Sequence, residues 1–225
     1  MEKKKNFAQK VAYWAALKVF FLVGLDITEE HIPEEFEPNE TDQAKRLTNF
    51  VCHIVDLTAN FCCGWKPNMA YYEGSVGRKR LEDVCEFITT KYPDHILLPD
   101  NKDGDIDRTN EQDLKYYKRL GFDGFTANPL MGFGKSMEIF LADPNLAVFL
   151  LCLTSNPGAN DILRGPAKEE GVEFLFHQIA RYATNTETWN KNGNLHLVVG
   201  GTNSPEDIAS IRKYAGENVQ FLMPG

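Results

Sequence analysis

The stretch His95-Ile-Leu-Leu-Pro-Asp-Asn-Lys-Asp-Gly-Asp-Ile-Asp-Arg-Thr109 joins a short apolar run to a dense group of charges. Residues 96–98 have the composition of a buried strand, and Asp100, Lys102 and Asp105 follow directly. If the strand continues to residue 102, Asp100 and Lys102 point the same way, because side chains alternate along a strand. A lysine between two carboxylates stays charged and holds a proton ready for transfer. Taken alone, the stretch is also compatible with a solvated acidic loop.

The same arrangement, an apolar run followed by polar or glycine- and proline-containing residues, recurs along the chain. The runs typical of buried strands are residues 19–25, 61–65, 96–98, 122–126, 146–153, 195–199 and 219–223. Helical periodicity lies between them, over residues 7–17, 44–60, 77–90, 111–120, 136–141 and 168–183 and from Ser204 onward. Apolar strands that alternate with helices predict a parallel sheet covered on both faces.

The ends of these strands favour a closed barrel over an open sheet. Polar motifs follow the strand ends at positions 26, 66, 100, 128, 154 and 200. In a β/α barrel all such ends meet on one face, where active sites lie, whereas an open doubly wound sheet gathers them at one switch point. We therefore predict an α/β fold, a single TIM-type (β/α)8 barrel domain over residues 1–225. Seven strands are readable, so we expect the eighth to be missing and the domain to be C-terminally incomplete.

Composition excludes several function classes. A net charge of −8 argues against a protein that grips nucleic-acid phosphates. The five cysteines are odd in number without a CxxC spacing, and the five histidines form no HxxxH pair, so neither disulfides nor a metal site is expected. Residues 20–25, an apolar run, are too few to span a membrane. We expect a cytoplasmic protein without membrane or nucleic-acid partners.

Three further motifs each have two interpretations. Gly132-Phe-Gly-Lys-Ser136 resembles the end of a nucleotide-binding P-loop, but that pattern needs glycine where Pro129 stands. Thr154-Ser-Asn-Pro-Gly158 is ordinary turn chemistry, or it places a hydroxyl and free amides beside a site. Lys66 follows a strand, and it is either a surface lysine or the partner of Asp100 on the adjacent strand.

In this order, the motifs resemble the orotidine 5′-phosphate decarboxylase family, in particular its longer bacterial-type branch. The resemblance is carried by Val23-Gly-Leu-Asp26, Lys66-Pro-Asn-Met-Ala-Tyr-Tyr-Glu73, Asp100-Asn-Lys-Asp-Gly-Asp-Ile106 with Thr109, Thr126-Ala-Asn-Pro129, Thr154-Ser-Asn-Pro-Gly158 and Val198-Val-Gly-Gly-Thr202. These segments occur in family order over nearly the whole chain. The DxKxxDI and TSNPG elements together make the resemblance specific.

The resemblance implies an enzyme that converts orotidine 5′-monophosphate to uridine 5′-monophosphate in pyrimidine biosynthesis, without metal or organic cofactor. By the same resemblance, Lys102 is the proton donor to the pyrimidine carbon that loses carbon dioxide. Asp100 flanks the substrate carboxylate, and Lys66 holds Asp100 and a ribose hydroxyl.

The resemblance also implies a homodimer with a shared active site. Asp105, together with Thr109, is expected to reach into the site of the neighbouring subunit. Asp26 resembles a ribose contact and Ser155 a pyrimidine-ring contact. The ligand expected in each site is orotidine or uridine monophosphate.

One expected part of the family pattern is not readable in this sequence. The family's phosphate-binding loop and its arginine follow the Pro-Gly at the end of the seventh strand, which here is Pro224-Gly225. Two interpretations remain. The sequence retains all four charged residues of the expected site, Lys66, Asp100, Lys102 and Asp105, which favours a decarboxylase whose last segment is missing or supplied elsewhere. The absent loop favours a non-catalytic relative that serves as a binding or assembly module. Another phosphosugar-type barrel enzyme would share the DxK element but not TSNPG.

Overall fold

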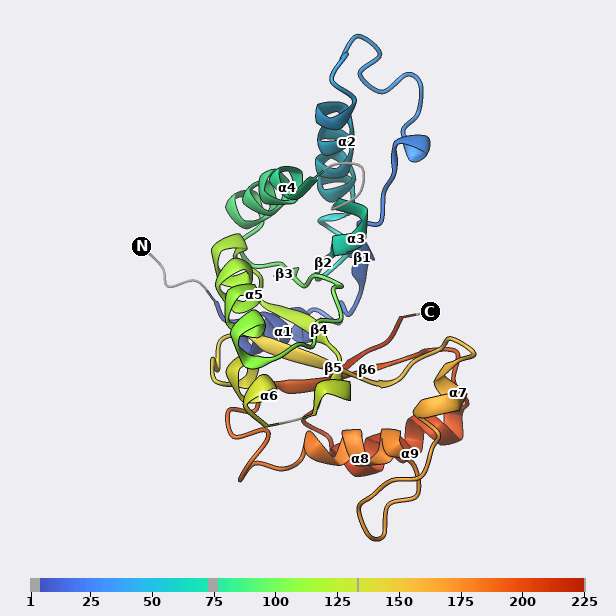
Figure 1. Cartoon of the computed structure of the whole chain (residues 1–225). Coiled ribbons are helices and arrows are strands. Elements are labelled where there is room, and N and C mark those ends of the chain that lie inside the picture. Colours follow the sequence, from blue (N-terminus) through green and yellow to red (C-terminus); the bar gives the residue numbers. More distant parts are fainter. Residues whose placement is uncertain (1–4, 73–76, 133, 225) are drawn as a thin grey trace. The chain divides into compact units, whose positions relative to one another are not determined.

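The computed structural model describes residues 5–72, 77–132 and 134–224 (Figure 1). The chain divides into two compact units. The first unit comprises Met1–Asn101 and Lys115–Gly124, and the second comprises Lys102–Leu114 and Phe125–Gly225. The boundary divides the helix Asp107–Leu120 and separates Gly124 from the rest of the strand Gly124–Ala127.

The seven strands expected from the sequence are all present, with different bounds. They are β1 Leu22–Gly24, β2 Gly64–Lys66, β3 Ile96–Leu97, β4 Gly124–Ala127, β5 Ala147–Leu153, β6 Leu195–Val199 and β7 Phe221–Leu222. The first sheet has the order β1-β2-β3 and the second the order β4-β5-β6-β7. The register pairs of β1 with β2, β2 with β3, β5 with β6 and β6 with β7 are parallel, which confirms the predicted α/β class.

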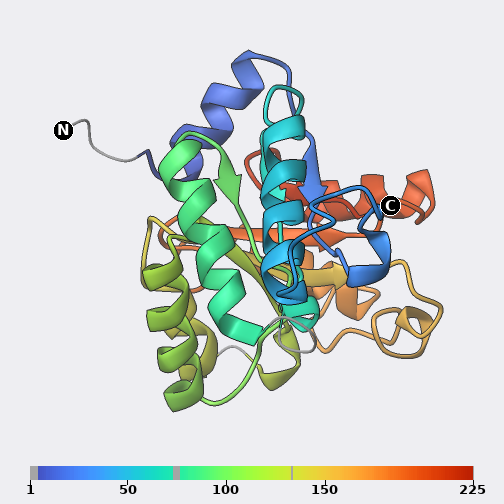
Figure 2. The same cartoon turned by 90° about the horizontal axis from the view of Figure 1, so that it is seen from above.

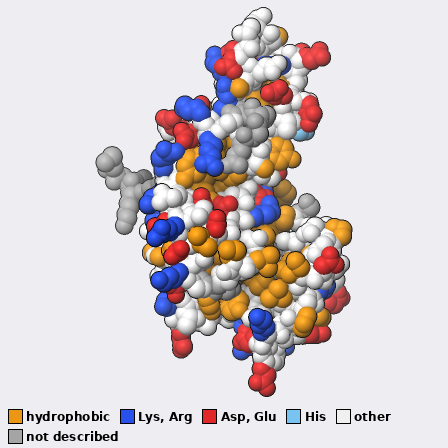
Figure 3. Space-filling view, viewed as in Figure 1, with side chains coloured by type: hydrophobic (Ala, Val, Ile, Leu, Met, Phe, Trp, Pro, Cys, Tyr) orange, Lys and Arg blue, Asp and Glu red, His pale blue; other side chains and the backbone are white. Residues whose placement is uncertain are grey.

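Helices follow the strands along the chain. The α-helices are α1 Phe7–Ala16, α2 Gln43–Thr58, α3 Met69–Tyr71, α4 Gly77–Lys91, α5 Asp107–Leu120, α6 Gly134–Leu141, α7 Ala159–Ile162, α8 Leu175–Tyr182 and α9 Pro205–Ala215, and two 3-10 turns are η1 Glu29–His31 and η3 Pro129–Met131. Charged side chains of both signs are interspersed on the face drawn in Figure 3. Across the described residues, no helix combines the length and apolar character needed to cross a bilayer.

The core of the first unit forms around β2. Trp65 is fully buried, and its ring stacks on that of His95 at a centroid distance of 4.7 Å. Gly64 is required beside it, since a Cβ there would overlap the carbonyl oxygen of Ile96 on the paired strand. Helices α2 and α4 pack side by side, as both views show (Figures 1 and 2). Their inward faces carry the apolar stripe predicted from helical spacing.

The core of the second unit forms around β5, the most continuously apolar run of the sequence. Six of its seven residues are buried, and all five residues of β6 are buried. Helices α8 and α9 lie next to each other, with α8 against β5 (Figure 1). Helix α9 begins as predicted, because the Ser204 hydroxyl accepts a hydrogen bond of 3.2 Å from the Asp207 amide.

Two predicted elements have different bounds in the structure. The strand expected over residues 19–25 begins only at Leu22, and Phe20 and Phe21 are 75% and 73% exposed. The cause lies at the end of α1, where Lys18 takes a left-handed conformation with φ of 58° and the Val19 amide bonds back to the Trp14 carbonyl. The residues after α1 therefore complete the helix end before the strand can start.

The helix expected over residues 168–183 is also shorter, because it begins at Leu175. Residues 166–174 form a turn instead, closed by an antiparallel bridge between Pro166 and Phe174. Gly171 has a φ of 77°, a left-handed conformation that glycine adopts without steric cost. Helical periodicity alone did not reveal this turn.

Candidate active site

All seven residues predicted to form the site lie at or beyond the carboxyl end of a strand. Asp26 follows β1, Lys66 is the last residue of β2, Asp100, Lys102 and Asp105 follow β3, Thr109 lies in the first turns of α5, and Ser155 follows β5. Within each of the two sheets, parallel strands bring their carboxyl ends to one edge, the place where sites form. The first unit holds three of the seven residues, and the second holds four.

Lys66 and Asp100 form the ion pair that the sequence suggested. The Lys66 ammonium donates a hydrogen bond of 2.7 Å to Asp100 Oδ2. Their side chains are only 17% and 16% exposed, so the pair is partly shielded from water. The Asp100 backbone is fixed as well, because its amide donates to Pro67 O at 2.8 Å and its carbonyl accepts from Met69 N at 3.2 Å. The carboxylate is therefore held in place before any ligand arrives.

We expected Asp100 and Lys102 to point the same way if the strand continued to residue 102. That condition is not met. The strand β3 ends at Leu97, and Lys102 has a left-handed backbone with φ of 57°. Pro99, which follows the strand, has no amide to donate. The amides of Leu98 and Asp100 on either side of it still bond toward the β2 side, so the missing donor falls on the opposite edge. The direction of Lys102 is set by other contacts.

Those contacts come from the end of β4. The Lys102 amide donates to Thr126 Oγ1 at 2.9 Å, and the Asp103 amide donates to the Thr126 carbonyl at 3.2 Å. The Asn128 amide returns a hydrogen bond of 2.7 Å to the Asp103 carbonyl. Gly104 lies so close that a Cβ would approach the Asn128 carbonyl oxygen to 2.6 Å. The sequence placed Thr126 in a family motif, but it gave no indication of this contact.

Asp105 is held by Asn110, a residue that the sequence reading missed. Asn110 Oδ1 accepts from the Asp105 amide at 3.1 Å, and its Nδ2 donates to the Asp105 carbonyl at 2.8 Å and to Ser136 O at 3.0 Å. Asn110 is fully buried. A signal was available, because Asn110 precedes the buried Tyr117 by seven residues and so shares its side of the helix.

Helix α5 starts one turn earlier than predicted, at Asp107, so Thr109 is helical and exposed. The Asp105 carboxylate accepts a hydrogen bond of 2.6 Å from the Ile106 amide, and Asp107 likewise accepts from Arg108. Carboxylates near a helix start are favoured by its unpaired amides and its dipole. The acidic stretch therefore starts the helix as well as supplying site residues.

Ser155 is exposed in the turn after β5. Gly200, at the end of β6, gives it room, since a Cβ there would lie 2.7 Å from the Ser155 amide nitrogen. Asn203 ties the two strand ends together, as its Nδ2 donates to Leu153 O at 3.1 Å and to Gly200 O at 2.9 Å. Asp26 is exposed after the buried Leu25. Both predicted ligand contacts are thus accessible, whereas Glu73 of the family motif lies outside the described residues.

Four of the five cysteines are buried, and the fifth, Cys52, is half-buried. All five are free, and burial raises the pKa values of Cys52 and Cys63 to about 11. Neutral buried thiols are poor nucleophiles and poor metal ligands. Within residues 5–72, 77–132 and 134–224, no group of three His, Cys, Asp or Glu side chains is arranged to hold a metal ion.

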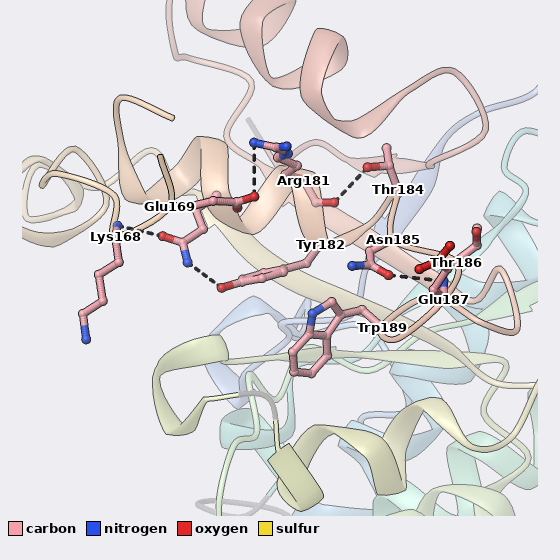
Figure 4. Close-up of a pocket in the computed structure, with 10 residues that line it drawn as sticks. Lys168, Glu169, Arg181, Tyr182, Thr184, Asn185, Thr186, Glu187 and Trp189 are labelled. Carbon is pink, nitrogen blue, oxygen red and sulfur yellow. Dashed lines mark hydrogen bonds and ion pairs between the residues drawn. The ribbon is translucent and has the colours of Figure 1, made fainter. Parts of the chain in front are cut away.

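A surface cavity of about 670 Å³ lies in the second unit and contains none of the predicted site residues (Figure 4). Its lining residues are Lys168, Glu169, Gln178, Arg181, Tyr182, Thr184, Asn185, Thr186, Glu187 and Trp189. An ion pair of 3.1 Å joins Arg181 and Glu169, two of the four charged residues of its wall. The Tyr182 hydroxyl accepts a hydrogen bond from Gln178. The polar groups of the cavity are largely engaged with one another.

Comparison with known proteins agrees with the motif order. Residues 21–225 match the sequence profile of the orotidine 5′-phosphate decarboxylase / HUMPS family. Orotidine 5′-phosphate decarboxylase of Dechloromonas aromatica is 35% identical over 215 residues, which cover 95% of this chain and 75% of the relative. The enzyme of the same name from Bordetella pertussis is 34% identical over 98% of this chain and 78% of the relative.

Solved structures lead to the same family. Leishmania donovani OMP decarboxylase superposes with a TM-score of 0.81 at 29% identity, covering 98% of this chain and 80% of that one. Leishmania donovani UMP synthase gives a TM-score of 0.80 at 30% identity, with 98% of this chain and 44% of that one covered. These neighbours have the TIM-type β/α fold class that the strand and helix pattern predicted. The chain belongs to the orotidine 5′-phosphate decarboxylase / HUMPS family.

Proposed function

We propose that this chain decarboxylates orotidine 5′-monophosphate and releases uridine 5′-monophosphate and carbon dioxide, a step of pyrimidine biosynthesis. The observation that carries the proposal is the Lys66–Asp100 ion pair of 2.7 Å, formed at the ends of adjacent strands in a chain of this family. Lys66 holds the partly shielded Asp100 carboxylate, and Lys102 follows it by two residues. These charges suit a reaction in which negative charge develops on the substrate.

The chemistry requires one fixed positive charge and one proton. When the substrate carboxylate leaves as carbon dioxide, the electron pair of the broken bond stays on the pyrimidine carbon. We assign Lys102 to this carbon, where its ammonium stabilises the developing carbanion and then transfers a proton to form the new C–H bond. The lysine amine afterwards regains a proton from water. In this proposed step the Lys102 ammonium supplies both the charge stabilisation and the proton, without a metal or organic cofactor.

Asp100 and Lys66 complete the reacting end of the site. Asp100 is assigned beside the substrate carboxylate, a like-charge contact that is relieved when carbon dioxide departs. Lys66 holds Asp100 at 2.7 Å, and it is also assigned to a ribose hydroxyl. Binding energy from parts of the substrate that do not react offsets the unfavourable contact.

The remaining assignments concern binding and assembly. Asp26 is assigned to the ribose and Ser155 to the pyrimidine ring, and both side chains are exposed. Asp105 and Thr109 are assigned to the site of a second subunit, which makes the functional form a homodimer. Their exposure is compatible with a contact across a subunit interface. We further propose that residues 1–225 belong to one β/α barrel domain.

We also propose that the enzyme works in the cytoplasm, without nucleic-acid or membrane partners. Its five cysteines are free thiols, as proteins of reducing compartments have. A net charge of −8 disfavours binding to nucleic acid.

The direct test is turnover of orotidine 5′-monophosphate by the purified chain. The absorbance of the substrate is followed over time, and the product is identified by chromatography against uridine 5′-monophosphate. We expect substrate loss matched mole for mole by uridine 5′-monophosphate. A folded, dimeric chain that produces none would overturn the proposal and favour a binding or assembly module.

A further inference from the structure

Lys102 has a backbone conformation that is uncommon for its residue type. Its φ of 57° lies in the left-handed region, which only a few per cent of non-glycine residues occupy. Asn and Asp stabilise this conformation through their own short polar side chains, a means that lysine lacks. Such a conformation persists where the surrounding structure determines it, and it is found often at functional sites.

The structure that surrounds Lys102 is the end of β4. Three hydrogen bonds of 2.7–3.2 Å join residues 102 and 103 to residues 126 and 128. Two of them join backbone atoms alone, so they do not depend on which side chain stands at position 126. The third, from the Lys102 amide to Thr126 Oγ1 at 2.9 Å, depends on a hydroxyl. It is also the bond made by the left-handed residue itself.

Thr126 is well placed to act as a fixed support. Its side chain is almost fully buried, with the residue 2% exposed, and Phe125 and Ala127 on either side are completely buried. The hydroxyl is therefore held by the packed end of β4, whereas Lys102 is exposed. A rigid strand that supports an exposed reactive side chain gives more precise placement than a loop alone.

We infer that Thr126 is the positioning residue of Lys102. Its hydroxyl holds the Lys102 backbone in the left-handed conformation, and this conformation sets the direction of the ammonium group. The inference rests on the proposed function, because it assigns Thr126 a part in proton transfer by Lys102. Without the hydroxyl, Lys102 relaxes to a negative φ and its side chain leaves the correct direction, while the groups that bind the ribose and the ring remain.

The test compares Thr126→Val, which removes the hydroxyl at nearly constant shape, with Thr126→Ser, which retains it. Steady-state decarboxylation is measured for both and for the unmodified chain. We expect Thr126→Val to lower kcat at least about tenfold with KM changed less than about threefold, the pattern of an interaction made in the transition state. Thr126→Ser should keep kcat within about threefold of the unmodified chain. An unchanged kcat in Thr126→Val, or an equal loss in Thr126→Ser, overturns the inference.

A second readout does not depend on activity. Amide hydrogen exchange in the absence of substrate reports the bond at the Lys102 amide directly. Thr126→Val should speed exchange at Lys102 by at least about tenfold, and the amides of Asp103 and Asn128 should change much less. Unchanged exchange at Lys102 overturns the inference even if kcat falls. If the unmodified chain does not turn over substrate, the proposed function fails, and the exchange result alone decides whether Thr126 holds Lys102.

Gly104→Ala covers the case in which Thr126→Val does not fold. The added Cβ would lie 2.6 Å from the Asn128 carbonyl oxygen, so it pushes residues 102–104 away from β4 without altering the strand. We expect the same selective loss of kcat. A Gly104→Ala enzyme with unchanged kcat contradicts the proposed positioning. Circular dichroism and the melting temperature establish that each variant is folded.

Discussion

The Lys66 ammonium donates a hydrogen bond of 2.7 Å to Asp100 Oδ2, from the end of β2 to the residues after β3. The pair joins two strands that are adjacent in the first sheet. The two backbone segments also pair beyond the ends of β2 and β3, through the parallel bridge between Asn68 and Asp100. The carboxylate is thus fixed both through its side chain and through its backbone, as a group that acts by position must be.

Removal of the Lys66 side chain should therefore lower kcat/KM strongly while the chain still folds. We expect Lys66→Ala to lower kcat/KM about 100-fold, the scale of loss for a displaced catalytic group. Steady-state kinetics with orotidine 5′-monophosphate provide the measurement. Lys91→Ala is the matched control, because Lys91 forms an exposed pair of similar length with Asp56. Activity of Lys66→Ala within about twofold of Lys91→Ala would show that the pair has no catalytic role.

The ion pair between Lys10 and Asp123 should instead support stability. It spans 2.8 Å with side chains only 3% and 4% exposed, and Lys10 also donates to His95 O at 2.7 Å. Removal of one partner leaves the other charge buried. We expect Lys10→Met to lower the free energy of unfolding by about 3–5 kcal/mol, measured by denaturant titration.

The control for this prediction is Lys79→Met, at an exposed pair with Asp83 on α4. Exposed pairs contribute about 0–1 kcal/mol, so this variant should remain close to the unmodified chain. The double variant Lys10→Met with Asp123→Leu should recover part of the loss, since no charge stays buried. Equal effects of Lys10→Met and Lys79→Met would refute the assignment.

His196 predicts a dependence of stability on pH. Burial within the second sheet lowers the pKa of His196 from 6.5 to about 4. Between these values the unfolded chain binds more protons than the folded chain, so stability is fully present above pH 6.5 and falls as pH drops toward 4. The loss from this residue should total about 3 kcal/mol.

His196→Leu should flatten this part of the pH profile, measured by denaturant titration at several pH values. Burial also lowers the pKa of His177, so some slope in the same direction will persist. His31→Asn, at an exposed position, is the control. A slope in His196→Leu as steep as in the control would mean that His196 is not the group that titrates.

The shared site of the proposed dimer predicts complementation between two inactive variants. Lys102→Ala and Asp105→Ala should each be inactive alone. Mixed in equal amounts, they should recover about a quarter of the unmodified activity, because half of the dimers are hybrids with one intact site each. Failure to recover, with subunit exchange confirmed by mass spectrometry, would place Asp105 in the site of its own subunit.

Much of this fold was predictable because its signals are local. Strand β5 is apolar over its whole length, and the cap at Ser204 follows from adjacent residues. The turn at Gly171 and the left-handed Lys18 were not predicted, since the local hydrogen bonds that form them leave no trace in the hydrophobic pattern.

The residues of the site also divide into those that the sequence predicted and those that only the structure reveals. Family motifs identified Lys66 and Asp100, and the structure contains their ion pair. The supporting residues Asn110 and Thr126 hold backbone groups of Asp105 and Lys102; helical spacing indicates that Asn110 is buried, but not which groups it binds. The contacts of Asn110 with Ser136 and of Thr126 with Lys102 join residues 26 and 24 positions apart, and only a three-dimensional structure reveals them.

The most direct test of the account is the role of Lys102 in turnover. The rate of conversion of orotidine 5′-monophosphate is measured for the unmodified chain, for Lys102→Ala and for Lys135→Ala, which removes an exposed lysine of α6. We expect Lys102→Ala to be folded and at least about 1,000-fold slower, while Lys135→Ala matches the unmodified chain. Turnover by Lys102→Ala at the unmodified rate would contradict it.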